Sequence, residues 1–235
     1  MYGREGFHVM IESLLIGIIS PAFLLYLIYI RTQKDKDINI AVNVIRCFIL
    51  GMLIVLPISF LEETLMKQGL PTANLGIMLS NLLIIAPLEE LGKLAIVFSI
   101  IKNKINLKTP PNLIIFSVAG AMGFALIENI IYVANGGIAT GLLRAISSVP
   151  MHASTAVIIG IFGSYEIIGN NKNHWWIGFL IAVLMHTFYN VYAMFFSNSF
   201  LFVGIFIIAF GYMIICDFLI GYILKNKNKE EGEDL

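Results

Sequence analysis

Residues 81–100 read NLLIIAPLEELGKLAIVFSI, an apolar run with two glutamates and a lysine near its middle. An apolar segment of this length predicts a membrane-spanning helix. A charge at the centre of a bilayer costs at least about 2.5–3.5 kcal/mol on insertion scales. Other apolar runs also contain ionisable residues: Glu128, Arg144, His152 and His186. Because so many such groups facing lipid would be hard to tolerate, we expect them to face one another and to form a polar site within the membrane.

The composition of the whole chain agrees with a membrane protein. Hydrophobic residues make up 58% of the 235 residues and charged residues 13%, and the mean hydropathy is +0.87. Soluble domains average about 45–50% apolar and about 25% charged residues. The predicted fold class is all-α, a polytopic bundle of about seven transmembrane helices. The formal net charge is zero, which argues against nucleic acid as a partner and leaves the lipid bilayer as the surroundings.

A spanning helix needs about 20 predominantly apolar residues. Seven runs qualify: residues 9–30, 39–61, 75–101, 111–134, 138–168, 174–197 and 200–224. The first run is longer than the core of a signal peptide, about 7–15 residues, so we interpret it as a helix that stays in the membrane. The fifth run is long, and we expect either a break at Pro150 or an extension beyond the bilayer. We assign residues 1–224 to one transmembrane domain and expect the charged tail, residues 225–235, to be disordered.

The basic residues between the predicted spans orient the chain. Lysines and arginines follow the first, third, fifth and seventh spans, whereas the opposite side has only Arg4 and Lys67. The positive-inside rule then places the N-terminus outside and the C-terminus in the cytoplasm. In this orientation the polar residues lie between the midplane and the outer face, so we expect a water-filled pocket that opens outward. The compact chain fits a bacterial plasma membrane.

The strongest local motif is EELGK at residues 89–93. On a helix, Glu89 and Lys93 are one turn apart on one face, and Glu90 lies three residues before Lys93. One glutamate can act on a water as a general acid/base while the other holds the lysine. The alternative is a buried Glu–Lys pair that only fixes helix packing. Pro87 lies two residues before the pair and Pro150 two residues before His152, so we expect both helices to be kinked beside the site.

A second motif surrounds Glu128. Phe124, Glu128 and Tyr132 share a helical face at four-residue spacing, and Asn129 follows the glutamate. We expect the two aromatic rings to shield the carboxylate from lipid, and the tyrosine to donate a hydrogen bond to it.

The remaining candidates lie in the last third of the chain. Arg144 and His152 share one helical row, and His186 and Asn190 are one turn apart. Arg144 is either a counter-ion for a glutamate or an anchor at the outer membrane interface. Each histidine is either a satisfied structural residue or part of the site, and the nearby glutamates favour the site. Asn190 can fix the tautomer of an imidazole or stabilise an oxyanion.

Two chemistries fit this set of carboxylates and imidazoles, and the residues alone leave both open. In the first, one of the glutamates 89–90 activates a water for amide hydrolysis without a metal, while His186 and Asn190 stabilise the oxyanion or donate a proton. In the second, Glu128, His152, His186 and one of the glutamates 89–90 bind Zn²⁺, which lowers the pKa of a bound water.

These motifs resemble the PrsW family of membrane-embedded proteases, which is related to the CAAX-protease and bacteriocin-processing superfamily. The resemblance covers a core of about residues 75–197. The family's EExxK motif matches residues 89–93, its FxxxE motif with the following Asn and Tyr matches residues 124–132, and its later histidines match His152 and His186. CAAX-protease relatives carry EExxxR, FxxxH and HxxxN. Here the basic residue is one position closer and a glutamate replaces the FxxxH histidine, which favours the PrsW branch.

The resemblance implies a stress-response protease that makes the first, site-1 cut in a single-pass anti-sigma factor, on its extracellular side. A CAAX-type prenyl-protein or bacteriocin-processing endopeptidase is the alternative within the superfamily. From another class, a proton-coupled transporter fits because intramembrane Glu, His and Arg also mark proton relays. Against a transporter, the sequence has no evident internal repeat of the kind that many carriers contain. A non-catalytic membrane scaffold is the last alternative, because Glu128 replaces the superfamily histidine.

Overall fold

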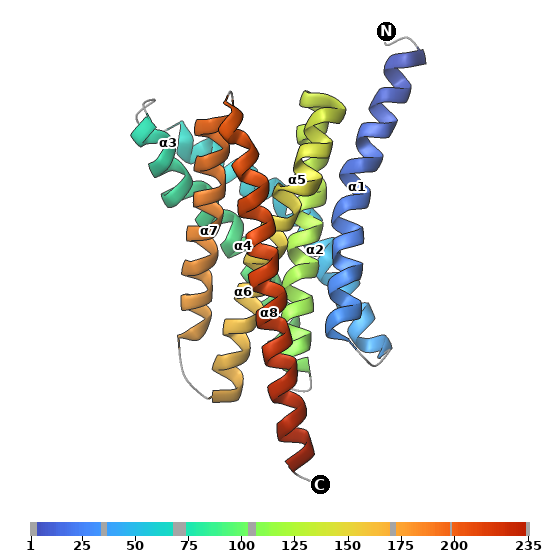
Figure 1. The fold of residues 1–235 in the computed structure, drawn as a ribbon, viewed down its shortest axis with the longest axis vertical. Coiled ribbons are helices and arrows are strands. Elements are labelled where there is room, and N and C mark those ends of the chain that lie inside the picture. Colours follow the sequence, from blue (N-terminus) through green and yellow to red (C-terminus); the bar gives the residue numbers. More distant parts are fainter. Residues whose placement is uncertain are drawn as a thin grey trace.

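The chain folds into a bundle of helices (Figure 1). The computed structural model describes residues 4–33, 37–67, 74–102, 107–169, 173–197 and 199–233, which contain helices and no strand. In chain order the elements are α1 (Arg4–Thr32), α2 (Ile38–Met66), α3 (Asn74–Ser80), π-helical η1 (Asn81–Ile85), α4 (Ala86–Ile101), α5 (Pro110–Ile146), α6 (Ser148–Gly169), α7 (His174–Phe196), 3₁₀-helical η3 (Phe200–Val203) and α8 (Gly204–Glu233). The all-α prediction is therefore confirmed.

Four stretches of the described chain are long and apolar enough to cross a membrane: α2, Pro110–Ile167, α7 and Phe200–Lys225. A shorter apolar stretch, Gly17–Thr32, lies in α1. The chain is thus a multi-pass membrane protein, whereas the number of seven spans stays a prediction. The predicted span 75–101 is divided among α3, η1 and α4. With 16 residues, α4 is only about 24 Å long, shorter than the hydrocarbon core of about 30 Å.

Pro150 lies in the first turn of α6 after a break, whereas Pro87 follows a π-helical turn in a backbone that stays helical from η1 into α4. Pro87 is the second residue of α4 and follows the π-helical turn η1. Pro150 is the third residue of α6, and the break in the fifth predicted span lies at Ser147, whose φ and ψ are −130° and −65°. In the first turn of a helix proline lacks only a donor that would have no intrahelical partner. The two glutamates and His152 therefore lie within the first two turns of α4 and α6.

A sharp reversal divides α5 at Gly137, which has φ 71° and ψ −166°. Fifteen residues of straight helix rise about 22 Å, yet the side chains of Asn129 and Arg144, 15 residues apart, are joined by a hydrogen bond. The segment after Gly137 must therefore fold back along α5. The reversal lies between the predicted spans 111–134 and 138–168. Glycine suits this position because other residues rarely adopt such a backbone conformation.

The first half of α5 forms the centre of the bundle, where residues 110–126 are all buried. Helices in a membrane associate through close packing, which small residues permit. A Cβ atom at Gly123 would collide with the carbonyl oxygen of Phe48 in α2, and one at Gly51 with the carbonyl oxygen of Gly120. The close contact of α2 with α5 therefore depends on glycine and fixes the helix that carries Glu128.

The two outer helices α1 and α8 extend furthest along the bundle (Figure 1). The beginning of α1 and the end of α8 lie at opposite ends of the long axis. The helix α8 continues to Glu233, through most of the tail for which we expected disorder. Lysine and glutamate, which dominate this segment, are good helix formers, so its helical backbone has a local cause.

Candidate active site

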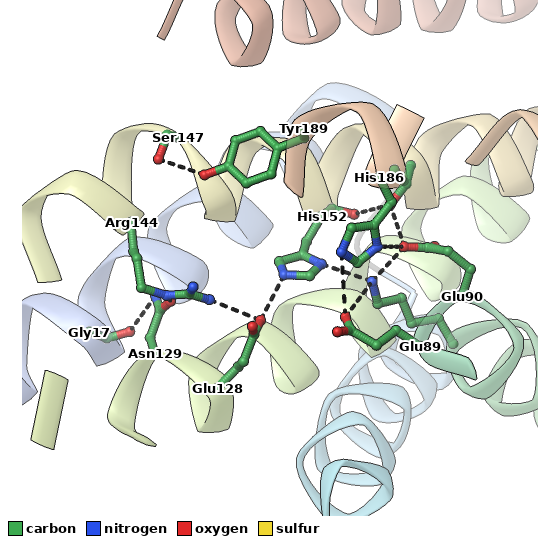
Figure 2. Close-up of polar contacts among 12 residues, drawn as sticks. Gly17, Glu89, Glu90, Glu128, Asn129, Arg144, Ser147, His152, His186 and Tyr189 are labelled. Carbon is green, nitrogen blue, oxygen red and sulfur yellow. Dashed lines mark hydrogen bonds and ion pairs between the residues drawn. The ribbon is translucent and has the colours of Figure 1, made fainter. Parts of the chain in front are cut away.

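The predicted site residues converge where α4, α5, α6 and α7 meet (Figure 2). Glu89 and Glu90 lie in the first turns of α4, Glu128 in α5, His152 in the second turn of α6 and His186 midway along α7. Both residues of the glutamate pair and both histidines are at most 6% exposed. The expectation that these ionisable groups face one another rather than lipid is confirmed.

Glu90 holds its neighbours through three hydrogen bonds to one carboxylate oxygen, Oε1. The donors are Lys93 Nζ at 2.8 Å, Thr155 Oγ1 at 3.2 Å and His186 Nδ1 at 2.7 Å. Because an ionised carboxylate only accepts hydrogen bonds, His186 carries its proton on Nδ1 and presents an unprotonated Nε2. Glu90 therefore fixes the tautomer of His186, a role for which the sequence had suggested Asn190.

Glu89 is the carboxylate of the pair that reaches the cavity described below. Its Oε2 atom is buried and has no hydrogen-bond partner among the described residues. Lys93 Nζ lies 3.9 Å from this oxygen and His186 Nε2 lies 3.8 Å from it, both beyond hydrogen-bond distance. A buried acceptor without a partner is unfavourable, so this oxygen is suited to bind a water, a substrate group or a metal ion.

His152 connects the lysine to Glu128. Its Nδ1 atom lies 2.8 Å from Lys93 Nζ, and its Nε2 atom lies 2.8 Å from Glu128 Oε2. An ammonium group only donates, so Nδ1 accepts and the proton of the neutral imidazole is on Nε2, from which it is donated to Glu128. Both histidines are thus held by a carboxylate on one side.

Arg144 is a counter-ion for Glu128. Its Nη2 atom forms an ion pair with Glu128 Oε2 at 2.9 Å, and its Nε atom donates to Asn129 Oδ1 at 2.7 Å. The guanidinium carbon lies 4.0 Å from the centre of the Tyr132 ring, a cation–π distance. We had expected Tyr132 to hydrogen-bond Glu128. Its ring instead packs on the arginine that pairs with Glu128, because the reversal at Gly137 brings Arg144 back to this turn.

A cavity of about 710 Å³ lies beside these groups, which we call the catalytic cavity. Its volume is typical of ligand sites, which measure about 300–1,000 Å³. The predicted site residues in its lining are Glu89, Phe124, Glu128, Tyr132, Arg144, His152 and Asn190. Phe124 also lies 5.1 Å from Lys93 Nζ, measured to the ring centre, so this ring shields the lysine as well as the carboxylates. Glu90, Lys93 and His186 support the cavity wall from behind.

Four residues of the site were not found from the sequence. Glu62, at the end of α2, lines the catalytic cavity, and its buried Oε1 has no hydrogen-bond partner among the described residues. Thr155 lies three residues after His152, so the helical period was a usable signal for it. Tyr189 donates a hydrogen bond of 2.8 Å to Ser147 Oγ and so ties α7 to the break before α6. Pro150 indicated a break in this span, but nothing in the sequence placed the break at Ser147.

The donor set at the cavity fits a zinc ion. One ligand atom each from Glu89, His152 and His186 can be chosen so that all lie within 4.8 Å of one another. Nitrogen and oxygen ligands suit Zn²⁺, and Glu89 Oε2 is one of the buried acceptors that have no hydrogen-bond partner among the described residues. A carboxylate that holds the second nitrogen of a histidine, as Glu90 does for His186, is the usual outer support of such a ligand. The set predicted from sequence contained Glu128, His152, His186 and one of the glutamates 89–90. The group in the structure contains Glu89 and both histidines but not Glu128, whose Oε2 atom pairs with Arg144.

Comparison with known proteins gives consistent results over most of the chain. A family described as "PrsW family intramembrane metalloprotease" matches residues 41–216. Protease PrsW of Oceanobacillus iheyensis is 31% identical over 222 residues, which cover 94% of this chain and 98% of the relative. Protease PrsW of Geobacillus kaustophilus is 28% identical over 180 residues, covering 76% and 78%, and that of Halalkalibacterium halodurans is 28% identical over 193 residues, covering 81% and 88%. No solved structure matches the chain.

Proposed function

This chain belongs to the PrsW family of intramembrane metalloproteases, and we propose that it makes the first cut in a single-pass membrane protein of the anti-sigma factor class. The substrate class comes from the family resemblance of the motifs. The cut lies on the extracellular side of a bacterial plasma membrane, because the polar site lies in the outer half of the bilayer in the orientation predicted from the basic loops. The opposite positions of the start of α1 and the end of α8 are consistent with termini on opposite sides.

The observation that carries this proposal is a pair of acceptors, Glu89 Oε2 and His186 Nε2, 3.8 Å apart and not bonded to each other. A water molecule that lies at an ordinary distance of about 2.8 Å from each atom can donate one hydrogen bond to Glu89 Oε2 and the other to His186 Nε2. Its oxygen then faces the catalytic cavity, where a substrate carbonyl binds. Glu89 accepts the proton of this water as general base and returns it to the amine leaving group.

The other residues hold this arrangement and stabilise the charge that develops. Glu90 keeps the lone pair of His186 Nε2 directed at the water by accepting the proton on Nδ1. Asn190 lines the cavity one turn after His186 and donates to the oxyanion. A single amide donor in such a position is worth about 2.7–4 kcal/mol of transition-state stabilisation. The ion pair of Arg144 with Glu128 fixes His152 on the opposite wall.

The same residues suggest how a metal would take part. Zn²⁺ would be held by Glu89, His152 and His186, with one nitrogen of His152 released from its contact with Lys93 or Glu128. It would lower the pKa of a bound water to near neutrality. His186 is already prepared for this because its unprotonated Nε2 is the free nitrogen. The zinc content of the purified chain distinguishes a metal-dependent reaction from one in which Glu89 acts as general base without a metal. About one equivalent per chain, lost in His186→Ala, is expected for the metal form. Full activity in metal-free protein is expected for the general-base form.

The proposal is tested by co-expression with epitope-tagged single-pass anti-sigma factors from the same genome. Wild type is compared with Glu89→Gln and with Glu63→Gln at matched membrane levels. Glu63 is the matched control, because its exposed carboxylate pairs with Lys67 and does not line the cavity. We expect an extracellular-side cut by wild type and Glu63→Gln that is lost in Glu89→Gln. Intact substrate in every lane would refute the substrate class, and a cut made by Glu89→Gln would refute the assigned base.

A further inference from the structure

A second cavity, of about 260 Å³, lies between α1, α6 and α8, and we call it the α1/α8 cavity. It shares no lining residue with the catalytic cavity. Most of its wall is aliphatic, with Leu24 and Leu27 from α1, Val157 from α6 and Ile220 from α8. Ser154 in this wall follows His152 by two residues, so the α1/α8 cavity lies behind the helix that carries a site histidine.

Three polar groups interrupt this apolar wall. Arg31 Nε donates to Asp217 Oδ1 at 3.0 Å, and the side chains of this pair are 47% and 68% exposed. The hydroxyl of Ser154 is buried and has no hydrogen-bond partner among the described residues, although the residue is only 2% exposed. Cys216 Sγ lies 3.5 Å from the carbonyl oxygen of Ser154, so Ser154 contacts the residue that precedes Asp217.

The Arg31–Asp217 pair is unusual because it is an exposed ion pair that includes a residue of an apolar, membrane-spanning stretch. Asp217 lies in the apolar stretch Phe200–Lys225, which is long enough to cross the membrane. A charge in such a stretch is unfavourable unless it has a polar partner. Their hydrogen bond uses one of the five N–H donors of Arg31 and one of the two oxygens of Asp217. Among the described residues, the pair therefore offers a cation with unused N–H donors beside an anion with an unused acceptor oxygen, on the exposed surface of α1 and α8.

We propose that the α1/α8 cavity binds one phospholipid with a primary ammonium headgroup, of the phosphatidylethanolamine class. The lipid phosphate accepts hydrogen bonds from Arg31, and its ammonium group donates to Asp217. One acyl chain lies between Leu24 and Met213, and Ser154 donates to an oxygen of the lipid. The site is independent of the proposed substrate, and Arg31 and Asp217 lie outside the residues that match the family.

The chemistry of the cavity favours this lipid over other occupants. A helix of a partner protein, about 10–12 Å in diameter with its side chains, is too wide for a cavity of about 260 Å³, and the aliphatic wall suits the narrower acyl chain of a lipid. A lipid with an anionic headgroup and no cation would bring a second negative charge to Asp217. A choline headgroup has the cation but no N–H donor for the carboxylate. A zwitterionic headgroup with a primary ammonium matches both charges of the pair.

Lipid binding to the purified, delipidated full chain tests the proposal. Native mass spectrometry measures the dissociation constants of phosphatidylethanolamine, phosphatidylcholine and phosphatidylglycerol with the same acyl chains. The variants are Asp217→Asn, which keeps the shape of the side chain, and Leu27→Trp, which fills the cavity from its exposed edge. Glu63→Gln is the matched control, since it removes one carboxylate from an exposed ion pair outside the cavity. Helical circular dichroism confirms that each variant is folded.

We expect one phosphatidylethanolamine per wild-type chain, bound about tenfold more tightly than the other two lipids, which is the effect of one charge-assisted hydrogen bond. Asp217→Asn should abolish this preference, Leu27→Trp should abolish binding, and Glu63→Gln should leave both unchanged. Equal binding of the three lipids, or a preference for phosphatidylglycerol, would overturn the proposal. So would a preference that Asp217→Asn and Leu27→Trp both retain.

Discussion

Replacing each glutamate of the pair by glutamine should affect stability very differently. Glu90 is fully buried and its Oε1 accepts three hydrogen bonds, so Glu90→Gln leaves the buried Lys93 ammonium without its close carboxylate. Removing one partner of a buried ion pair costs about 3–5 kcal/mol. Glu89 Oε2 has no hydrogen-bond partner among the described residues. Glu89→Gln therefore breaks no bond at this atom, and we expect a loss below about 1 kcal/mol.

Thermal unfolding of the purified chain in detergent measures this difference. At about 2–4 °C per kcal/mol, Glu90→Gln should lower the Tm by about 6–20 °C. Glu89→Gln and the control Glu63→Gln should unfold within about 4 °C of wild type. Both active-site variants should lose proteolysis, so Glu89→Gln separates activity from stability. Equal Tm shifts for the two, or a larger shift for Glu89→Gln, would refute the assignment of Glu90 as the residue that holds the lysine.

Three further substitutions test other parts of the site. Arg144→Lys keeps the charge but loses the planar guanidinium that bonds Asn129 and packs on Tyr132, so we expect a loss of about 1–3 kcal/mol in unfolding free energy and weaker proteolysis. Gly137→Ala forces a side chain into a conformation that essentially only glycine adopts, and unfolding should show a loss of about 1–3 kcal/mol; an unchanged Tm would contradict the reversal. Glu62→Gln replaces a cavity-lining carboxyl group away from the reacting atoms, so steady-state kinetics should show a raised KM with kcat within about threefold of wild type.

The convergence of the ionisable residues could be predicted from the sequence because the membrane leaves few alternatives. Charges in apolar segments are unfavourable unless they face one another, so their convergence needed no knowledge of the helix packing. The structure brings Glu89, Glu90, Glu128, His152 and His186 together as expected. The sequence could not predict which glutamate bonds Lys93 and His186 and which one reaches the cavity, because this depends on which side chain contacts α7.

The backbone irregularities were harder to predict. Pro87 and Pro150 indicated disturbed helices, but whether a proline kinks a helix or begins one depends on the preceding backbone. That backbone is a π-helical turn before α4 and a break at Ser147 before α6. The role of Arg144 was left open for the same reason, since it depends on the reversal at Gly137. Local sequence does not specify how the surrounding helices compensate the hydrogen bonds lost at such points.

Two charged residues were overlooked because position along a span is a weak guide to exposure. Glu62 follows the last residue of the predicted span 39–61, where a charge is expected at the membrane interface. The structure shows that it lines the catalytic cavity. Asp217 lies well inside an apolar stretch, and its partner Arg31 is 186 residues away in the chain. Neither relation has a local sequence signal, because both depend on helices that are distant in sequence.

The most direct test of the central claim, that Glu89 activates the attacking water, is the cleavage rate of a tagged single-pass substrate by the purified chain in liposomes. Wild type, Glu89→Gln and Glu63→Gln are compared after their Tm values have been shown to agree. We predict that Glu89→Gln cleaves about 10²–10⁴-fold more slowly than wild type, the usual contribution of a general base, while Glu63→Gln cleaves at the wild-type rate. A folded Glu89→Gln variant that cleaves within a few-fold of wild type would contradict the account.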